Sequence, residues 1–486
     1  MDEQEKIEKR ARLRLFLTEI FMSLSVIFLV AFLTMLVMGY SFHLTKLGKD
    51  EPVVERTGLV QVSSSPTGAT VTLDGGTPLL LRTNTSRTLS AGTHEISLTK
   101  DGYDSWTKTV TITEGMMYRL NYPKLFLLDR EVEPVLEKLA PSSFVSATPN
   151  GEKLLLRDSE TKTFSSLDIS SSKTAKKSLD FPAALALETV SSVKPLAWSG
   201  NSKKLLLRLD GKFAVFDLET PSSSLLLDSL LPEALASGNL ADVKFETGSG
   251  ERLLLLSNSG ELFELDLKTQ TLSSPLLTHV LKFTNNEDKL LFLSDRSASL
   301  ALYTYRVGDD ESYLLKSLPS NASLDSVRFA WTDYFESLFF ALALDSDLKI
   351  YSLKTWPEED IAALDSVETF ETVAETSLPF APASLKARGK GLFFALENSD
   401  GTEKAVFDLE AEVLQSFTIQ HENSWLDEFL HFEITDAQEL WVTDYDGNNW
   451  RLLASDVVAS SPVVFSKNNK YLYYFTSAGL VREKVS

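Results

Sequence analysis

A repeated pattern of apolar strands constrains the fold of this chain more than any other feature of its sequence. In residues 123–486, a short turn containing Gly, Asn or a charge precedes a run of Leu, Phe or Val, and a second strand-like run follows. The apolar runs begin at residues 154, 205, 253, 290, 338, 392, 429 and 471. Their mean spacing of about 45 residues is the length of a four-stranded β-propeller blade. The pattern predicts eight blades, or seven if the weak copy near 338 or 392 is an insertion.

Helical repeats of similar length are the main alternative to a propeller. The apolar runs are short, and turn-forming sequences such as Asp210-Gly211 and Asn258-Ser259-Gly260 soon follow them, which favours strands over helices. Because a ring of sheets must join its first and last blades, we expect residues 123–128 to pair with the blade that contains residues 471–475.

The second strand of the repeat ends in an acidic turn in several copies, at residues 213–218, 262–267 and 405–409. The sequence Glu-Leu-Trp-Val-Thr-Asp-Tyr-Asp-Gly-Asn at residues 439–448 has the same form. These repeats resemble those of propellers related to the periplasmic protein TolB. The resemblance agrees with a propeller over residues 123–486.

An uncharged apolar run, Ile20–Phe42, lies near the N-terminus. At a rise of about 1.5 Å per residue, a helix of this length crosses the roughly 30 Å hydrocarbon core of a bilayer. A cleaved signal peptide is the alternative, but such a segment is shorter and ends in small residues, whereas this run ends in Tyr40, Phe42 and His43. The run therefore predicts a transmembrane helix at residues 20–42.

The charges that flank this run predict its orientation. Five basic residues precede it, whereas Lys46 and Lys49, which follow it, are soon diluted by acidic residues. Cytoplasmic ends of membrane helices are enriched in Lys and Arg, so residues 1–19 are predicted to be a cytoplasmic tail. The five basic residues of the tail are Lys6, Lys9, Arg10, Arg12 and Arg14. Acidic residues in the tail cancel them, which leaves the formal net charge of −21 to the extracytoplasmic part.

A small β-domain is predicted at residues 58–122, after a polar linker at 43–57. Short alternating runs at 59–62, 70–73, 94–98 and 107–112 are separated by turn residues, as in half-buried strands. Four motifs, Ser-Pro-Thr-Gly-Ala-Thr-Val, Leu-Asp-Gly, Ala-Gly-Thr-His and Lys-Asp-Gly-Tyr, occur here in that order. They resemble the PEGA family, with Thr67 in place of the Glu. The resemblance implies a PEGA-like β-sandwich outside the cytoplasm, without catalytic residues.

No residue pattern predicts a catalytic, cofactor-binding or metal-binding site. The absence of Cys excludes disulfides, thiolate metal ligands and Cys catalysis. None of the five His residues has a second His four residues on, and the chain has no G-x-S-x-G elbow or phosphate loop. The one local cluster, His421 and His431 with nearby carboxylates, is attributed to chance on an acidic surface. A strand through Leu430–Ile434 would place His431 and Glu433 on one face.

Two further motifs have ordinary structural interpretations. Residues 444–449 offer oxygens at three positions of a calcium loop, but Asn449 stands where that loop needs Gly. Asp-Gly-Asn is a good hairpin turn, so a turn is predicted there. Asn84 and Asn321 each begin an N-glycosylation motif that is short enough to occur by chance.

The charge and the predicted layout limit the function. A net charge of −21 repels nucleic acids and anionic membrane surfaces. We expect a membrane-anchored surface or envelope protein, without a catalytic role or cofactor, whose propeller binds a protein or an envelope polymer. The alternative is a propeller-type hydrolase or lyase that acts on envelope glycans or peptides. A deep pocket lined by His, Tyr, Arg and carboxylates would favour the enzyme, and a shallow face with exposed aromatic residues would favour binding.

Overall fold

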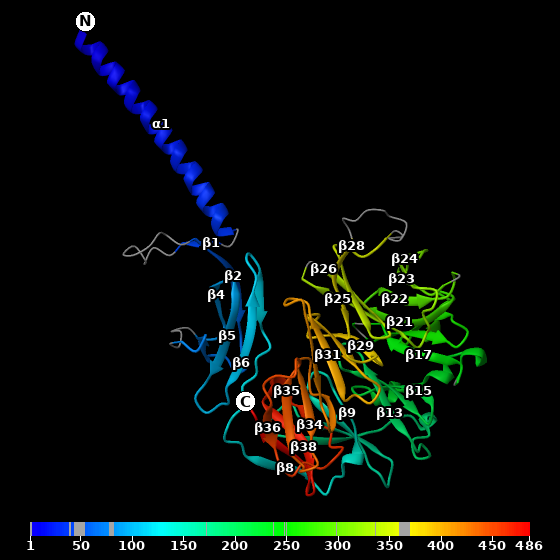
Figure 1. Cartoon of the computed structure of the whole chain (residues 1–486). Coiled ribbons are helices and arrows are strands. Elements are labelled where there is room, and N and C mark those ends of the chain that lie inside the picture. The colour runs from blue at the N-terminus through cyan, green and yellow to red at the C-terminus, as the bar shows by residue number, and fades with distance from the viewer. Residues whose placement is uncertain are drawn as a thin grey trace. The chain divides into compact units, whose positions relative to one another are not determined.

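The computed structural model shows a mostly β chain with one long N-terminal helix (Figure 1). It describes residues 2–37, 40–42, 54–76, 82–171, 173–236, 238–246, 248, 250–297, 299–335, 337–358 and 370–486. The chain divides into two compact units, residues 1–128 and 129–486. The prediction of an all-β fold with one N-terminal helix is confirmed. The sequence placed the start of the second unit at residue 123, six residues before the observed division.

The helix α1 covers Asp2–Val37. Its segment Phe16–Met35 is apolar, exposes its side chains, and has the length needed to cross a membrane. The helix ends before the predicted Phe42, because Tyr40–Phe42 forms the short strand β1, which pairs with β2. Aromatic residues favour strands, which accounts for this difference. Of the predicted linker, residues 43–53 lie outside the described residues, and residues 54–57 belong to β2.

Two sheets follow the helix in the first unit. One contains β1, β2 (Val54–Val62), β4 (Thr85–Ser90) and β7 (Met117–Leu120), and the other contains β3 (Thr70–Leu73), β5 (Gly92–Thr99) and β6 (Trp106–Ile112). Buried and exposed residues alternate strictly along β6, as expected for a strand that covers a core with one face. Each of the four predicted strands lies within one of these strands. The predicted turn at Asp74-Gly75 is present, and both residues have positive φ.

The segment predicted to close the ring belongs instead to the first unit. Lys124 forms a parallel bridge with Ser65, and Leu127 forms an antiparallel bridge with Tyr103. Leu125 and Phe126 are buried, and this burial explains why the segment is as apolar as a strand of the propeller. The prediction that residues 123–128 pair with the last blade was therefore wrong.

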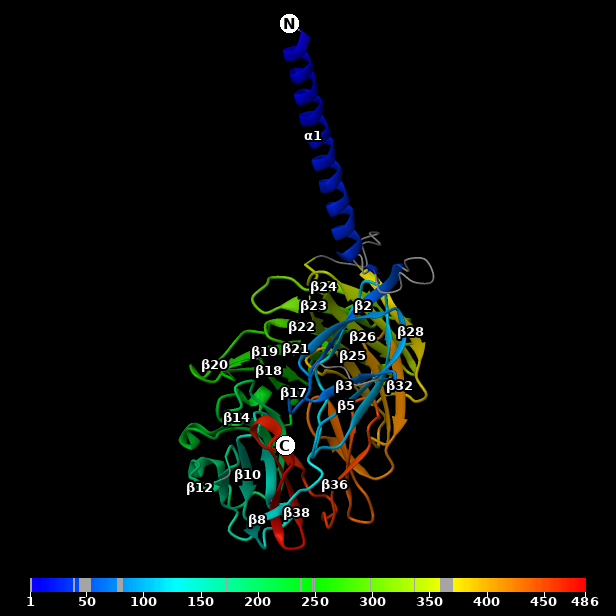
Figure 2. The same ribbon diagram turned by 90° about the vertical axis from the view of Figure 1, so that its left-hand side faces the viewer.

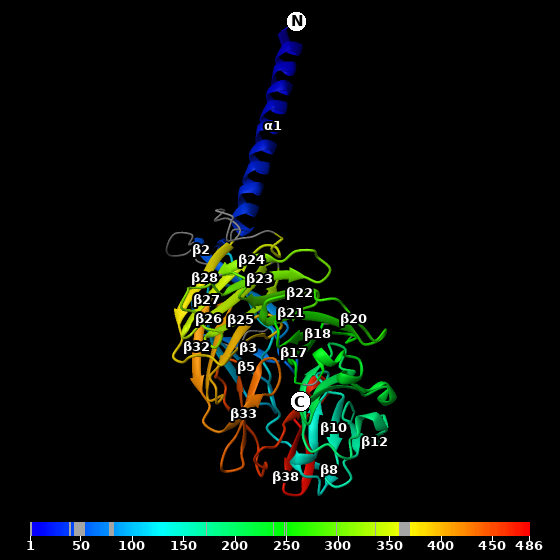
Figure 3. The same ribbon diagram turned by 90° about the vertical axis from the view of Figure 1, so that its right-hand side faces the viewer.

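The second unit is a β-propeller of four-stranded antiparallel sheets, and eight such sheets occur among its described residues (Figures 2 and 3). The strands of the first four sheets, inner strand first, are β9 (Phe144–Ala147), β10 (Lys153–Arg157), β11 (Phe164–Asp168) and β12 (Ala175–Leu179); β13 (Val193–Trp198), β14 (Lys204–Leu209), β15 (Lys212–Asp217) and β16 (Leu225–Leu226); β17 (Leu240–Phe245), β18 (Arg252–Ser257), β19 (Leu262–Asp266) and β20 (Thr271–Leu272); and β21 (Val280–Asn286), β22 (Lys289–Ser294), β23 (Ala301–Arg306) and β24 (Tyr313–Ser317).

The remaining sheets are built in the same way. They are β25 (Val327–Tyr334), β26 (Ser337–Leu344), β27 (Asp347–Leu353) and β28 (Phe370–Ser377); β29 (Ser384–Arg388), β30 (Phe393–Glu397), β31 (Glu403–Asp408) and β32 (Val413–Thr418); β33 (Glu422–Trp425), β34 (Leu430–Ile434), β35 (Leu440–Asp444) and β36 (Arg451–Ala454); and β37 (Val464–Phe465), β38 (Tyr471–Thr476), β39 (Gly479–Lys484) and β8 (Val132–Glu137). The weak sequence copies near 338 and 392 correspond to β26 and β30, each the second strand of a complete sheet.

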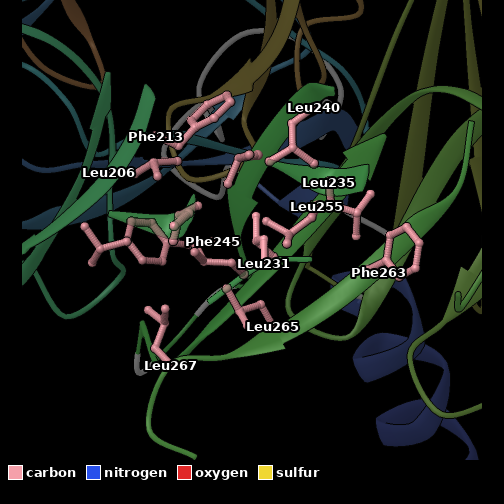
Figure 4. Packing of buried hydrophobic residues seen from close by; sticks show 14 residues of the cluster. Leu206, Phe213, Leu231, Leu235, Leu240, Phe245, Leu255, Phe263, Leu265 and Leu267 are labelled. Carbon is pink, nitrogen blue, oxygen red and sulfur yellow. The ribbon is translucent and has the colours of Figure 1, made fainter. Parts of the chain in front are cut away.

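The apolar runs of the repeat form the second strands, which are buried on both faces. In β14, for example, Leu205, Leu206 and Leu207 are all fully buried. Leu206 packs with Phe245 and Leu255 of the next sheet in one cluster (Figure 4), whereas Leu205 and Leu207 pack in the cluster on the other side of their sheet. Because each sheet is covered by a neighbour on both faces, its central strand is continuously apolar and does not alternate.

The acidic turns of the repeat cap the third strands. The Asp217 carboxylate accepts hydrogen bonds from the backbone N–H groups of Glu219 and Thr220. Asp266 and Asp408 make the same pair of bonds two and three residues ahead. An Asp side chain that bonds the following backbone stabilises a turn, which explains why this residue recurs at the end of the strand.

The ring is closed by a strand from the beginning of the unit. Strand β8 pairs antiparallel with β39, so Val132 lies opposite Glu483 and Leu136 lies opposite Leu480. The closing pair is supported by two ion pairs, Arg130 to Glu483 at 2.7 Å and Arg482 Nε to Glu133 Oε2 at 2.8 Å. The expectation that the two ends of the propeller share one sheet is confirmed, although a different strand closes it.

Candidate functional site

Basic residues occur repeatedly on the inner strands of the propeller. Lys244, Lys282 and Arg328 lie on three consecutive inner strands, β17, β21 and β25, and each donates a hydrogen bond to a carbonyl of the next blade. Lys244 bonds the Phe283 carbonyl, Lys282 bonds the Leu324 carbonyl at 2.5 Å, and Arg328 bonds the Ala383 carbonyl at 2.7 Å. An inner strand has one free edge, and basic side chains commonly protect such edges. These three cations therefore have a structural role.

The next inner strand, β29, carries two basic residues that lack such partners. The ammonium group of Lys386 and the N–H groups of Arg388 donate no hydrogen bond to any residue that the structure describes. Both cations therefore retain their capacity to bind an anion.

Two hollows meet at this strand. The first, which we call the basic hollow, has a volume of about 860 Å³ and is lined mainly by residues of β17, β21, β25 and β29. The second, of about 930 Å³, is lined by residues around β9, β29, β33 and β37. Lys386, Arg388 and Glu428 line both hollows. They thus stand where an extended ligand could pass from one hollow to the other.

The charge of the basic hollow opposes that of the whole protein. Its lining contains six basic residues, Lys244, Lys282, Arg328, Lys386, Arg388 and Lys390, and three acidic residues, Asp242, Asp333 and Glu428. The chain as a whole has a formal net charge of −21. A concave site with an excess of one sign of charge concentrates ions of the opposite sign. The basic hollow has more basic than acidic residues, so it attracts anions although the average surface repels them.

Arg388 is held against an aromatic ring. Its Cζ atom lies 4.2 Å from the ring centroid of Trp425, within the range of a cation–π interaction. The Trp425 indole N–H donates to Glu397 at 2.8 Å, and Lys404 donates to the same carboxylate oxygen at 2.8 Å. Burial lowers the pKa of Arg388, while Glu428, Glu397 and Asp427 act in the opposite direction. A guanidinium starts from so high a pKa that it stays charged at neutral pH.

Glu428 is the acidic residue that lines both hollows together with Lys386 and Arg388. Its carboxylate accepts the backbone N–H of Gly389 at 3.0 Å. Gly389 has a φ of +64°, and a Cβ atom there would lie 2.5 Å from the Phe393 ring, so only glycine fits this turn. The turn fixes Glu428 beside the two free cations of β29, where a carboxylate can orient a bound ligand or limit which anions enter.

Lys282 and Arg328 lie close enough in the basic hollow for their positive charges to interact. Burial lowers its pKa, the positive charge of Arg328 lowers it further, and Asp325 partly offsets both effects. An anion that binds between Lys282 and Arg328 would relieve their repulsion.

The two histidines of the cluster found in the sequence lie in different surroundings. His431 is fully buried, with its ring 3.6 Å from that of Trp425 and 5.5 Å from that of Phe417. His421 is partly exposed and lies 4.0 Å from Glu433 and 3.8 Å from Asp436. No group of three metal-binding side chains occurs within the described ranges. Strand β34 does carry His431 and Glu433, as predicted.

Residues 444–449 form a turn, as predicted. One Asp444 oxygen pairs with Arg451 at 2.6 Å, and the other accepts from the Asn449 side chain at 2.9 Å. Gly447 and Asn449 both have positive φ, as expected for a tight turn. The carboxylate that would bind the ion is thus already used in the turn.

The basic hollow was not found from the sequence. Lys244, Lys282 and Arg328 come from different repeats and are separated by about one repeat length, so no local motif joins them to one another or to the basic residues at 386–390. A signal was nevertheless present, because Lys244, Lys282 and Arg328 each lie in the strand that precedes an apolar run. The sequence-based expectation for an enzyme is a pocket lined by His, Tyr, Arg and carboxylates. The described linings of both hollows contain no Tyr and no His. These linings contain Lys, Arg, Trp and carboxylates.

Comparison with known proteins identifies one domain. A model of the PEGA domain matches residues 57–124. No curated protein matches the chain.

Among solved structures, the second unit is similar to several propellers. The C-terminal WD40 domain of Sif2 is 11% identical, with a TM-score of 0.44, over 73% of this chain and 98% of that one. The β-propeller domain of Cps50 (Swd1) from Myceliophteria thermophila is 11% identical, with a TM-score of 0.37, over 73% and 99%. An oligogalacturonate lyase in complex with manganese is 11% identical, with a TM-score of 0.39, over 74% and 97%. The family match and the strand pairing together show that the chain carries a PEGA domain at residues 57–124, followed by a β-propeller.

Proposed function

We propose that this chain is a membrane-anchored extracytoplasmic surface or envelope protein whose propeller binds an anionic segment of a partner protein or envelope polymer. The basic hollow carries this proposal, because it offers the free cations Lys386 and Arg388 in an otherwise acidic protein. Trp425 holds Arg388 in place before a ligand arrives. A preorganised cation loses less conformational entropy on binding, which favours affinity.

The anchoring part of the proposal rests on α1 and on the PEGA domain. The segment Phe16–Met35 has the length and composition of a membrane span, and the basic residues before it favour a cytoplasmic N-terminus. The PEGA domain and the propeller, which we take to be of the TolB-like kind because of its acidic turns, would then lie outside the cytoplasm.

Protease treatment of intact cells tests this orientation. Protease added outside should degrade the chain beyond about residue 45 and leave the N-terminal tail intact. A C-terminal epitope that stays protected in intact cells and becomes accessible only after lysis would contradict the proposed topology.

Binding to model polyanions tests the role of the basic hollow. The full-length chain in detergent micelles is titrated with a polyuronate, with polyglutamate and with neutral dextran. We expect at least one polyanion to bind, with an affinity that falls as salt is added, because salt screens exposed charges. Binding should weaken about tenfold or more in a variant that combines Lys386→Gln with Arg388→Gln, since each charge-assisted bond contributes about 1.5–3 kcal/mol.

A matched variant separates the basic hollow from general charge effects. Lys176 and Lys177 are exposed on the outer strand β12, so Lys176→Gln with Lys177→Gln removes the same charge elsewhere. This control should bind as the unchanged protein does. Equal losses in both variants, or no binding to either polyanion, would overturn the proposal. Capture of partners from solubilised membranes with both variants as bait then distinguishes a protein from a polymer.

A further inference from the structure

A smaller hollow of different chemistry lies where the sheet of β29–β32 is followed by the sheet of β33–β36. Its volume is about 430 Å³. We call it the tryptophan hollow, and its lining residues are Thr418, Gln420, His421, Glu433, Thr435, Trp441 and Trp450. None of these residues lines the basic hollow.

Two indole rings supply its apolar surface. Trp441 lies on β35, directly opposite Glu433 of β34 in the strand pairing, and its indole N–H donates to Glu439 at 3.0 Å. Trp450 precedes β36 and leaves 39% of its surface exposed. The hydrogen bond restrains the Trp441 ring, whereas the exposed Trp450 offers a flat apolar face to a ligand.

One carboxylate is positioned beside these rings. Glu433 is only 8% exposed, and its Oε1 atom accepts the backbone N–H of His421 at 2.9 Å. Its other oxygen, Oε2, has no hydrogen-bond partner among the described residues. This oxygen is not one of the fully buried atoms that lack a partner, so a ligand hydroxyl can reach it and donate a hydrogen bond to it.

We propose that the tryptophan hollow is a binding site for a neutral pyranose sugar. A pyranose ring has an apolar C–H face, which can stack on an indole, and a rim of hydroxyl groups, which donate and accept hydrogen bonds. The hollow combines both requirements, since Trp441 and Trp450 provide apolar faces and Glu433 provides an acceptor. Aromatic walls with a few fixed polar groups are the usual composition of a small-molecule site. Gln420 and Thr418 add groups that can donate and accept.

The charge of the hollow selects against acidic sugars. No Lys or Arg occurs among its described lining residues, and Glu433 is its one carboxylate. Asp436, fully exposed beside His421, adds a second negative charge nearby. An anion would be repelled here, so the two hollows should take ligands of different charge.

Intrinsic fluorescence of the full-length chain in detergent micelles tests this site. The probes are neutral tetrasaccharides of glucose, N-acetylglucosamine and mannose, with a tetrasaccharide of galacturonate as the acidic counterpart. We expect at least one neutral probe to change the tryptophan emission in a saturable way, and the acidic probe to have no effect at this site. Trp450→Ala should weaken binding at least tenfold, and Glu433→Gln should weaken it severalfold.

Two controls separate this site from other effects. Phe335 is a 64% exposed aromatic residue outside the hollow, so Phe335→Ala should leave sugar binding unchanged. The variant with Lys386→Gln and Arg388→Gln should also bind sugar normally, because the proposal does not depend on the basic hollow. Thermal unfolding of each variant confirms that it folds. The proposal is overturned if no neutral probe binds at millimolar concentration, or if Trp450→Ala binds as tightly as the unchanged chain.

Discussion

The guanidinium of Arg388 stacks on the ring of Trp425, with 4.2 Å between the Arg388 Cζ atom and the ring centroid. The same indole donates its N–H to Glu397, so one side chain connects a cation of the basic hollow to a partly buried carboxylate. Burial acts to raise the pKa of Glu397, but the hydrogen bonds from Lys404 and Trp425 and the charge of Lys404 hold it below its ordinary value. Glu397 therefore remains an anion that fixes the orientation of the indole.

Replacing Trp425 with Phe should cost stability and ligand affinity together. The change keeps an aromatic ring but removes the N–H donor, and a hydrogen bond to a charged group contributes about 1.5–3 kcal/mol. Denaturant unfolding measures the loss. Trp198→Phe is the matched control, because the Trp198 indole donates to the neutral Ser146 hydroxyl, where about 1 kcal/mol is expected. Equal losses in the two variants would show that the charge of Glu397 adds nothing.

Gly479→Ala should destabilise the propeller by breaking its closing strand pair. Gly479 has a φ of +129°, and an added Cβ atom would lie 2.3 Å from the backbone oxygen of Leu136 on β8. The two strands must separate to admit it, so we expect a loss of more than about 2 kcal/mol, beyond the roughly 1–2 kcal/mol of backbone strain. Gly211 also has positive φ, but its added Cβ atom would meet no atom within 4 Å. Gly211→Ala therefore reports the strain alone, and similar melting of the two variants would contradict a tight closing contact.

Stability should fall in mildly acidic solution because of His431. Burial lowers the pKa of His431 well below its ordinary value of 6.5, and the charges of Lys404 and Arg388 lower it further. The folded protein keeps this imidazole neutral, whereas the unfolded chain binds a proton below about pH 6.5. The stability is therefore complete above pH 6.5 and is lost as the pH falls, by up to about 1.4 kcal/mol per pH unit.

The variant His431→Leu isolates this contribution. Its free energy of unfolding, measured between pH 7.5 and 5, should depend less steeply on pH than that of the unchanged protein. If the Leu variant and the unchanged protein have parallel pH profiles, then protonation of His431 does not govern acid stability.

The repeat could be predicted from the sequence because each part of it has a local cause. Leu205, Leu206 and Leu207 form a continuous apolar run since neighbouring sheets cover both faces of their strand. Asp217 ends its strand because its carboxylate accepts hydrogen bonds from the backbone N–H groups of Glu219 and Thr220 in the turn. Each of these two signals is contained within a few consecutive residues, which is the range over which a sequence pattern can be recognised.

Pairings between distant residues could not be predicted in the same way. The apolar segment 123–128 looked more like a closing strand than Val132–Glu137, which contains Pro134 and two Glu residues. Proline lacks an N–H donor but is tolerated in a strand at the edge of a sheet, and β8 is such a strand. The cations of the basic hollow were missed for a related reason, because the ring brings Lys244, Lys282 and Arg328 together from separate repeats.

The closing strand pair also determines when the propeller can be completed. Arg130 and Glu483, which pair across this joint, are 353 residues apart in the chain. At roughly 5–20 residues per second, the ribosome needs on the order of 20–70 s to make the chain between them. During this time β8 has been synthesised but has no strand to pair with, and its edge can pair with another nascent chain instead. The ring is thus sealed only after Glu483 has been made, and a chain whose synthesis stops before that residue leaves an open edge.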